Sequence, residues 1–423
     1  MPHNTTHKEV AILVLIVEKD EVWPVEQLAE EFKSLVLSTG LEIEDMMRIK
    51  LRVINPAFFI GKGKVEELEL LVKSSQANVV IFNSNLNYRQ QKNLEEVFGL
   101  KTVDRTQLIL DIFAKHANTQ EGILQVELAQ LNYMLPRLRG KGIMLSRLGG
   151  GIGTIGPGEK KVEVDRRVID DHITQLKKEL EQVKQHRSVM RKKREKEGIH
   201  ICSLVGYTNA GKTTLFNALT DSNQVESSAM FTTLDTVTRS LNIHKNIKAI
   251  LSDTVGFIYK LPHNLVESFK ATLEELKFAD ILLHVIDASN ENHVKLRKSV
   301  DIVLKDIGVE SKPTINIFNK IDKLSEQEMN SFRKEYPKDI FVSAYKKINI
   351  DELKELIHNT LNADMIDVIV RLAFNQMHMT NYLHKNCEIL KTSYEENEVV
   401  FFIKSKNDKL DYLKKKGILI ENL

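Results

Sequence analysis

A glycine-rich stretch in the middle of the chain has the spacing of a phosphate-binding loop. Residues 206–213 read GYTNAGKT, which matches G-x-x-x-x-G-K-[ST] between the apolar run IHICSLV and the helical run TTLFNALT. The glycines would let the loop close around phosphates with its backbone N–H groups facing inward. Lys212 would reach the β and γ phosphates, and the Thr213 hydroxyl would bind Mg²⁺. We therefore predict a nucleotide site that includes Gly206, Tyr207, Thr208, Asn209, Ala210, Gly211, Lys212, Thr213 and Thr214.

A second motif, FNKID at 318–322, indicates which base is bound. The Asn319 side chain can bond guanine N7, and the Asp322 carboxylate can accept from guanine N1–H and the 2-amino group. Adenine offers neither donor, so it would leave a buried carboxylate unpaired, which is costly. Such a motif alone also fits a surface turn, but its position after a phosphate loop and an apolar strand favours guanine. The predicted base-reading residues are Asn319, Lys320, Ile321 and Asp322.

A weaker signal is VSAYK at 342–346, which follows another short apolar run. Its turn could present a backbone N–H to guanine O6. The residues concerned are Ser343, Ala344 and Tyr345.

The stretch DTVGFI at 253–258 suits a grip on magnesium and the terminal phosphate. Asp253 would act from the second coordination shell of Mg²⁺, and Gly256 would donate its N–H to the γ phosphate. The residues expected at the nucleotide are Asp253, Thr254, Val255 and Gly256. Many GTPases have a water-orienting glutamine after this glycine, but here the residue is Phe257, which cannot orient water by hydrogen bonding. Another group of the protein, or a partner, must then orient the attacking water.

The segment MFTTLDTVTR at 230–239 lies where a nucleotide-dependent switch is expected. Such a switch needs a threonine that touches the metal only when GTP is present. Spacing alone does not choose among Thr232, Thr233, Thr236 and Thr238.

The elements around these motifs predict a multidomain α/β protein. Residues 1–115 alternate strand-like and helical runs (VAILVLIV, VEQLAEEFKSLV, a run ending at LRVINP, GKVEELELLVKSS, NVVIFN), which indicates a small α/β sheet domain. Residues 199–362 are expected to form a P-loop GTPase domain, with ILLHVID and TINIFNK as central parallel strands. Residues 363–423 form a small α+β domain that includes the strand EVVFFIK.

Between the two sheet domains, residues 116–198 predict a long helical hairpin whose glycine-rich connection is 139–158. Two apolar seams step by 4, 3, 4, 3, as in coiled coils. The first is Leu124, Leu128, Leu131, Leu135 and Leu138; the second is Ile169, Ile173, Leu176, Leu180 and Val183. Each seam could instead pack on its own domain. We interpret the basic run at 184–198 as a solvated linker helix.

Composition bounds the setting of the protein. The 423 residues carry a net charge of only +2, so any nucleic-acid surface must be local. Two distant cysteines form neither a disulfide framework nor a zinc site, which fits a reducing, cytoplasmic compartment. The run VAILVLIV is too short to span a bilayer, so no membrane span is expected.

Together these motifs resemble the HflX family of translation-factor-related GTPases. The stretches that carry the resemblance are GKGKVEEL, VDRTQLILDIFA, GILQVELAQL and SRLGGGIGTIGPGEKKVEVDRR, and it covers the chain to about residue 361. The family's switch F-A-T-L-D is similar to FTTLD, which implies Thr233 as the metal-touching threonine. The implied nucleotide contacts there are Phe231, Thr232, Thr233, Leu234 and Asp235.

The sequence departs from the family pattern in three places. The family commonly has Arg at Ile155, Thr-Gln-Leu-Glu at 160–163 and Pro at Thr236. The first two differences affect contacts at the hairpin tip rather than the nucleotide site. The tail beyond 365 matches least.

The resemblance implies a ribosome-associated GTPase that hydrolyses GTP to GDP with Mg²⁺, is stimulated by the large (50S) subunit, and splits or rescues stalled ribosomes under stress. Lys212, Thr233 and Gly256 would act in hydrolysis. The family's front half has also been linked to ATP, for which GKGK at 61–64 is the candidate, although a lone run of this kind before a helix is more often only a loop and helix cap. We expect a cytoplasmic monomer. A signalling switch acting on a protein effector is the alternative; an ATP-driven helicase-like remodeller is disfavoured by FNKID.

RNA contact has some support from the residues themselves. No Asp or Glu occurs from Leu128 to Gly158, a window with a basic, glycine-rich character that suits RNA backbone contacts. A flexible connector with incidental charge is the alternative. The candidate contacts are Arg137, Arg139, Lys141 and Arg147.

Overall fold

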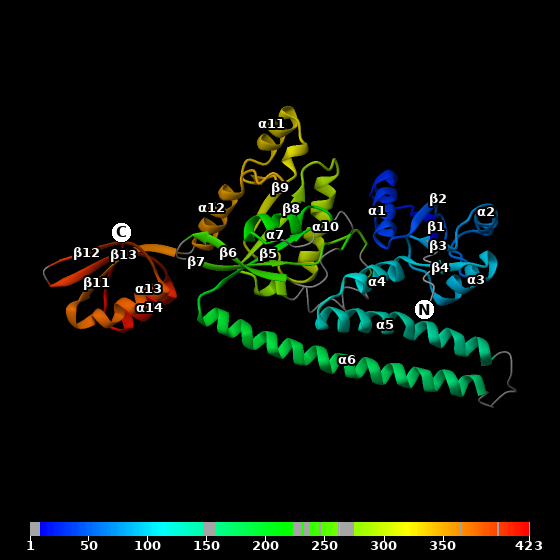
Figure 1. The fold of residues 1–423 in the computed structure, drawn as a ribbon, viewed down its shortest axis with the longest axis horizontal. Coiled ribbons are helices and arrows are strands. Elements are labelled where there is room, and N and C mark those ends of the chain that lie inside the picture. Colours follow the sequence, from blue (N-terminus) through cyan, green and yellow to red (C-terminus); the bar gives the residue numbers. More distant parts are fainter. Residues whose placement is uncertain are drawn as a thin grey trace, which may run out of the picture.

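The computed structural model describes residues 9–146, 157–222, 230–231, 237–244, 247–260, 262, 275–363, 365–395 and 397–422. Figure 1 shows two sheet-containing units above a long helical hairpin, with a third, smaller sheet unit at the C-terminal end. The predicted α/β fold class is confirmed.

The N-terminal unit is a four-stranded parallel sheet in the order β2-β1-β3-β4. Its strands are β1 (Val10–Val17), β2 (Glu42–Lys50), β3 (Val79–Phe82) and β4 (Lys101–Val103). Its helices are α1 (Val25–Ser38), α2 (Lys62–Ser74), α3 (Tyr88–Phe98) and α4 (Arg105–His116). Alternate residues of β1 enter two different apolar clusters, so both faces of the sheet are covered, as a continuous apolar run requires.

The second strand of this unit differs from the expectation. We expected an apolar strand ending in LRVINP, but β2 ends at Lys50 and Val53 is 80% exposed. β2 lies at the edge of the sheet and reads EIEDMMRIK. An edge strand is only partly buried, so its weak apolar pattern did not reveal it.

Two long helices, α5 (Gln120–Ser146) and α6 (Pro157–Lys196), lie side by side along the molecule (Figure 1). The predicted seams do face one another: Leu124 and Leu128 form a buried cluster with Ile173 and Leu176. The helical backbone runs through to Ser146, into the range expected to be the glycine-rich connection. The low helix propensity of glycine, about 1 kcal/mol per residue, is evidently too small to end so long a helix at Gly140 or Gly142.

The third unit holds a six-stranded sheet in the order β10-β9-β8-β5-β7-β6, parallel except for the pairing of β6 with β7. Its strands are β5 (His200–Gly206), β6 (Val237–His244), β7 (Ile247–Asp253), β8 (Ile281–Asp287), β9 (Thr314–Asn319) and β10 (Ile340–Phe341). Its described α-helices are α7 (Lys212–Thr220), α10 (His293–Asp306), α11 (Glu326–Glu335) and α12 (Ile350–Leu361). Its 3₁₀ turns are η1 (Glu275–Phe278) and η2 (Ile321–Lys323). As predicted, the ILLHVID and TINIFN runs are the inner strands β8 and β9.

The C-terminal unit is an antiparallel sheet in the order β12-β13-β11-β14, covered on one face by short helices. Its strands are β11 (Met365–Ala373), β12 (Glu388–Tyr394), β13 (Glu398–Lys406) and β14 (Leu419–Asn422). Its helical elements are η3 (Phe374–Met379), α13 (Thr380–Asn386) and α14 (Asn407–Lys415). The EVVFFIK strand predicted from the sequence is the first part of β13.

Candidate nucleotide-binding site

The loop 206–213 joins β5 to the start of α7, as its motif predicts. Glycine is required at both glycine positions of the motif. A Cβ on Gly206 would collide with the Val285 backbone carbonyl, and one on Gly211, whose φ is +92°, would collide with the Asn319 side chain. The loop therefore lies tightly against β8 and β9, and the positive end of α7 faces the space where phosphates would bind.

Lys212 is buried within this loop. Its Nζ donates to the carbonyl oxygens of Gly206 at 3.2 Å and Tyr207 at 2.7 Å. Burial lowers the pKa of Lys212 to about 8, and the nearby Asp253 carboxylate opposes that shift. A phosphate would compensate the desolvated charge, so the geometry suits the role predicted for this lysine.

A hydroxyl and a carboxylate meet beside Lys212. Thr213 Oγ1 donates to Asp253 Oδ2 at 3.1 Å, and Asp253 is fully buried. Hard oxygen atoms such as these are what Mg²⁺ prefers, so the residues fit the ion. Within the described ranges no three His, Cys, Asp or Glu side chains converge on a metal site.

The guanine-reading candidates come together at the same edge of the sheet. Asn319 Nδ2 donates to Ala210 O at 3.0 Å, and the Ala344 amide donates to Asn319 Oδ1 at 3.0 Å. Ser343 Oγ donates to Asp322 Oδ1 at 2.5 Å. The three motifs thus form one connected site. The contact of a backbone N–H from the Ser343–Ala344 turn with guanine O6 stays a prediction; the Ala344 amide of that turn donates to Asn319 here.

Asp287 also belongs to the site, although no sequence motif predicted it. Lys320 Nζ donates to Asp287 Oδ2 and to Asn209 O, both at 2.7 Å, so the carboxylate fixes the lysine over the phosphate loop. Its signal was available: Asp287 ends the apolar run ILLHVID, and the carboxyl ends of parallel strands are where ligands bind.

Asp322→Asn should change the base that is bound. The amide replaces an acceptor of guanine N1–H and the 2-amino group with a donor, so we expect GTP affinity to fall by roughly 10²-fold or more, at about 1.4 kcal/mol per tenfold. A titration with a fluorescent GTP analogue measures this, with Asp351→Asn, an exposed aspartate in the same unit, as the control. Unchanged affinity in the folded variant would mean that Asp322 does not read the base.

His284 makes stability sensitive to acid. It is 1% exposed on β8, and burial, assisted by the charges of Arg297 and Lys212, lowers its pKa to about 3. The neighbouring Asp301 Oδ1 is 3.9 Å from its Nδ1. Unfolding exposes a histidine of ordinary pKa, near 6.5. Between about pH 6.5 and 3 the unfolded state therefore binds a proton at this histidine that the folded state does not bind. Stability should therefore fall as pH drops from 6.5 towards 3, and His284→Gln should flatten that part of the denaturation-midpoint curve. An unchanged slope would contradict this.

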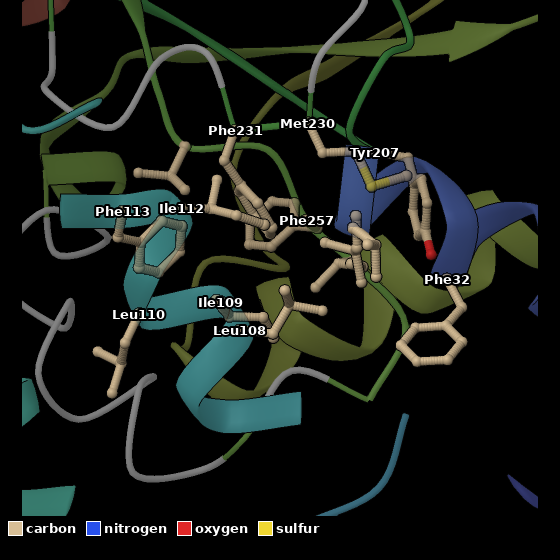
Figure 2. Close-up of a cluster of buried hydrophobic side chains, with 14 of the residues drawn as sticks. Phe32, Leu108, Ile109, Leu110, Ile112, Phe113, Tyr207, Met230, Phe231 and Phe257 are labelled. Carbon is tan, nitrogen blue, oxygen red and sulfur yellow. The ribbon is translucent and has the colours of Figure 1, made fainter. Parts of the chain in front are cut away.

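The segment after Asp253 is closed onto the loop. The Phe257 amide donates to Gly206 O at 3.1 Å, and the Thr208 amide donates to Phe257 O at 2.8 Å. Phe257 itself is 2% exposed, and its ring packs into an apolar cluster (Figure 2). The residue that occupies the place of a water-orienting glutamine is thus a core residue.

That cluster belongs to two units at once. Figure 2 shows Phe257, Tyr207 and the first two residues of the expected switch segment, Met230 and Phe231, among side chains of α1 and α4. The rings of Phe231 and Phe113 lie edge-to-face with their centroids 4.8 Å apart, and the Met230 amide donates to Ser38 Oγ at 2.8 Å. Phe231, which the family resemblance placed at the nucleotide, is here packed against the N-terminal unit. Residues 232–236, and with them the predicted contacts Thr232, Thr233, Leu234 and Asp235, lie outside the described residues.

The four candidate RNA contacts lie in different surroundings. Arg137 is held within the chain: it donates to Asp104 Oδ2 and Leu86 O, both at 2.9 Å, and lies over the Tyr133 ring. Its main contacts are therefore structural. Arg139 and Lys141 belong to helix α5, and Arg147 falls outside the described residues. At GKGK, Gly61 precedes α2 and Lys64 pairs with Glu67, as expected of a loop and helix start.

A mainly parallel sheet, with a loop of phosphate-binding spacing and the predicted magnesium and guanine residues gathered at one edge, is the arrangement of a P-loop GTPase. Curated proteins described as GTPase HflX are similar over nearly the whole chain. The one from Caldanaerobacter subterraneus subsp. tengcongensis is 46% identical, covering 93% of this chain and 90% of that protein. The one from Lacrimispora saccharolytica is 40% identical, covering 93% and 92%. The chain belongs to the HflX family of GTPases.

Family models agree with this assignment along the chain. Residues 26–114 match "GTP-binding GTPase N-terminal", 116–194 match "GTP-binding GTPase Middle Region", and 201–320 match "50S ribosome-binding GTPase". Among solved structures, the SsGBP and GDP complex is similar with 27% identity and a TM-score of 0.48, covering 84% of this chain and 99% of that one. Among the described helices, none combines the length and apolar character needed to cross a membrane.

Proposed function

We propose that this GTPase works on the ribosome, chiefly on the 50S subunit and its rRNA, and that binding there accelerates hydrolysis. The match of residues 201–320 to a ribosome-binding GTPase model supports this partner. So does the long hairpin of α5 and α6 (Figure 1), since the sequence from 128 to 158, which begins within α5, lacks acidic residues. The role that follows is splitting or rescuing stalled ribosomes under stress, by a monomer in the cytoplasm.

The burial of Phe257 is the observation that carries the proposal. Its ring is 2% exposed, so it neither faces the γ phosphate nor bonds water. Intrinsic hydrolysis should then be slow, and the partner should supply the contacts that orient the attacking water. Activating contributions in trans are worth a factor of about 10³ to 10⁵ in phosphoryl transfer.

Within the site, each residue has a proposed task. The Lys212 ammonium would contact the β and γ phosphates, and the Gly256 N–H would donate to the γ phosphate. Thr213, Thr233 and, from the second shell, Asp253 would hold Mg²⁺, which neutralises phosphate charge when bound. Asn319, Asp322 and the 343–345 turn would select guanine.

The RNA contacts proposed at the hairpin are Arg139, Lys141 and Arg147. Arg137 is left out, because it is committed to Asp104 and Leu86.

Sedimentation with purified 50S subunits tests the proposal. We expect the form loaded with a non-hydrolysable GTP analogue to pellet with 50S, and the GDP form to pellet much less. The triple variant Arg139→Ala, Lys141→Ala, Arg147→Ala should pellet less at moderate salt, whereas Lys298→Ala on α10 should not. If neither nucleotide form pellets, the partner is not the large subunit, and a protein effector becomes the better hypothesis.

A further inference from the structure

A buried polar network links the N-terminal unit to the phosphate loop. Glu31 on α1 and Arg105 on α4 are each 7% exposed, and Tyr207 of the loop is 8% exposed. The Glu31 carboxylate accepts from the Tyr207 hydroxyl through Oε2 and from Arg105 Nη2 at 3.0 Å through Oε1. All three lie at the apolar cluster shared by the two units, where water is largely excluded and such bonds are costly to break.

Both arms of the network end on the backbone of one residue, Tyr259. The Tyr259 amide donates to the Tyr207 hydroxyl at 2.7 Å, and Arg105 Nη2 donates to Tyr259 O at 2.7 Å. The Tyr259 ring adds a stack on Trp23, with centroids 4.4 Å apart, and its hydroxyl donates to Glu21 Oε1 at 2.7 Å. The segment that follows the γ-phosphate glycine is thus fixed by the N-terminal unit.

Fixing Tyr259 also constrains Gly256, which lies three residues earlier. Phe257 is bonded on both sides to the loop, and Gly256 lies so close to it that an added Cβ would be 2.9 Å from both Lys212 Nζ and Thr208 Cγ2. This close packing of Gly256 on Lys212 and Thr208 lies where a γ phosphate bonded to both Lys212 and the Gly256 amide would have to enter. We therefore expect GTP to require a shift of Gly256, whereas GDP, which lacks the third phosphate, does not.

We propose that Glu31 and Arg105 are positioning residues that set the preference between GTP and GDP. By holding Tyr259, they keep Gly256 against Lys212 and so oppose the γ phosphate selectively. A ligand shifts such an equilibrium only through its different affinity for the two arrangements, so the network should weaken GTP and leave GDP nearly unaffected. The inference rests on the proposed contact between Gly256 and the γ phosphate.

The test compares affinities for a fluorescent GDP and a fluorescent non-hydrolysable GTP analogue in the full chain. One variant replaces both partners, Glu31→Leu with Arg105→Met, which avoids leaving one charge buried alone. The other is Tyr207→Phe, which keeps the ring and removes the hydroxyl. The control is Arg48→Met, from an exposed Arg–Glu pair in the same unit.

In both test variants the affinity for the GTP analogue should rise roughly tenfold relative to that for GDP, the worth of one or two buried hydrogen bonds, and the control should match the wild type. Equal changes for the two nucleotides, or no change in a variant whose thermal melt shows it to be folded, would overturn the proposal. If the double variant does not fold, Tyr207→Phe decides. The outcome is independent of the ribosome, since none is present. If the wild type bound the two nucleotides but Gly256→Ala did not alter analogue affinity, the fault would lie in the proposed γ-phosphate contact.

Discussion

Lys212→Ala is expected to lower GTP turnover by roughly 10²- to 10³-fold, the usual effect of removing one preorganised group that stabilises transition-state charge. The ammonium is buried at the turn between β5 and α7, and its hydrogen bonds to Gly206 O and Tyr207 O hold it there. Steady-state phosphate release at saturating GTP measures the loss. The rate constant is the relevant quantity, because nucleotide affinity should also fall.

The matched control is Lys298→Ala, a substitution of an exposed lysine on α10 of the same unit. It should leave turnover within about twofold. A Lys212→Ala protein that binds nucleotide and turns over at the wild-type rate would remove the phosphate loop from the mechanism.

Phe257→Ala is expected to destabilise the protein by about 3–5 kcal/mol, as deleting a large buried aromatic side chain does. The ring lies in the cluster formed with α1 and α4, so the substitution leaves a cavity between the two units (Figure 2). Denaturant midpoints of the affected transition measure the effect. Phe257→Gln should also destabilise, because it buries an amide without a partner. Loss of ribosome stimulation in that variant therefore counts only if the protein is folded.

The control for this prediction is Phe374→Ala in the C-terminal unit, where the side chain is 59% exposed. Its effect should lie within about 0.5 kcal/mol. If the two substitutions cost the same, the cluster would not join the units in solution.

The nucleotide site was largely predictable because its chemistry is local in sequence. Lys212 and Thr213 belong to one loop, Asn319 and Asp322 to another, and the fixed spacing within each motif reports its geometry. The heptad seams of α5 and α6 were predictable for a similar reason, since a helical period repeats over many residues. The chemistry of Asp287 was predictable only from its place at a strand end.

The contacts between units were not predictable in this way. Tyr207 and Glu31 are 176 residues apart, and Arg105 and Tyr259 are 154 apart. No periodicity connects such positions, and a buried glutamate on an amphipathic helix looks like a solvated one in the sequence. For the same reason Phe257 could be recognised as unable to orient water, but not as part of a core shared with α1 and α4.

GTP turnover by the purified protein, alone and with added 50S subunits, tests the central claim most directly, with ATP as the control nucleotide. We expect slow turnover of GTP alone, strong stimulation by 50S, and no stimulated turnover of ATP. Fast turnover of GTP without subunits, or turnover that 50S leaves unchanged, would contradict a GTPase whose hydrolysis is completed by the ribosome.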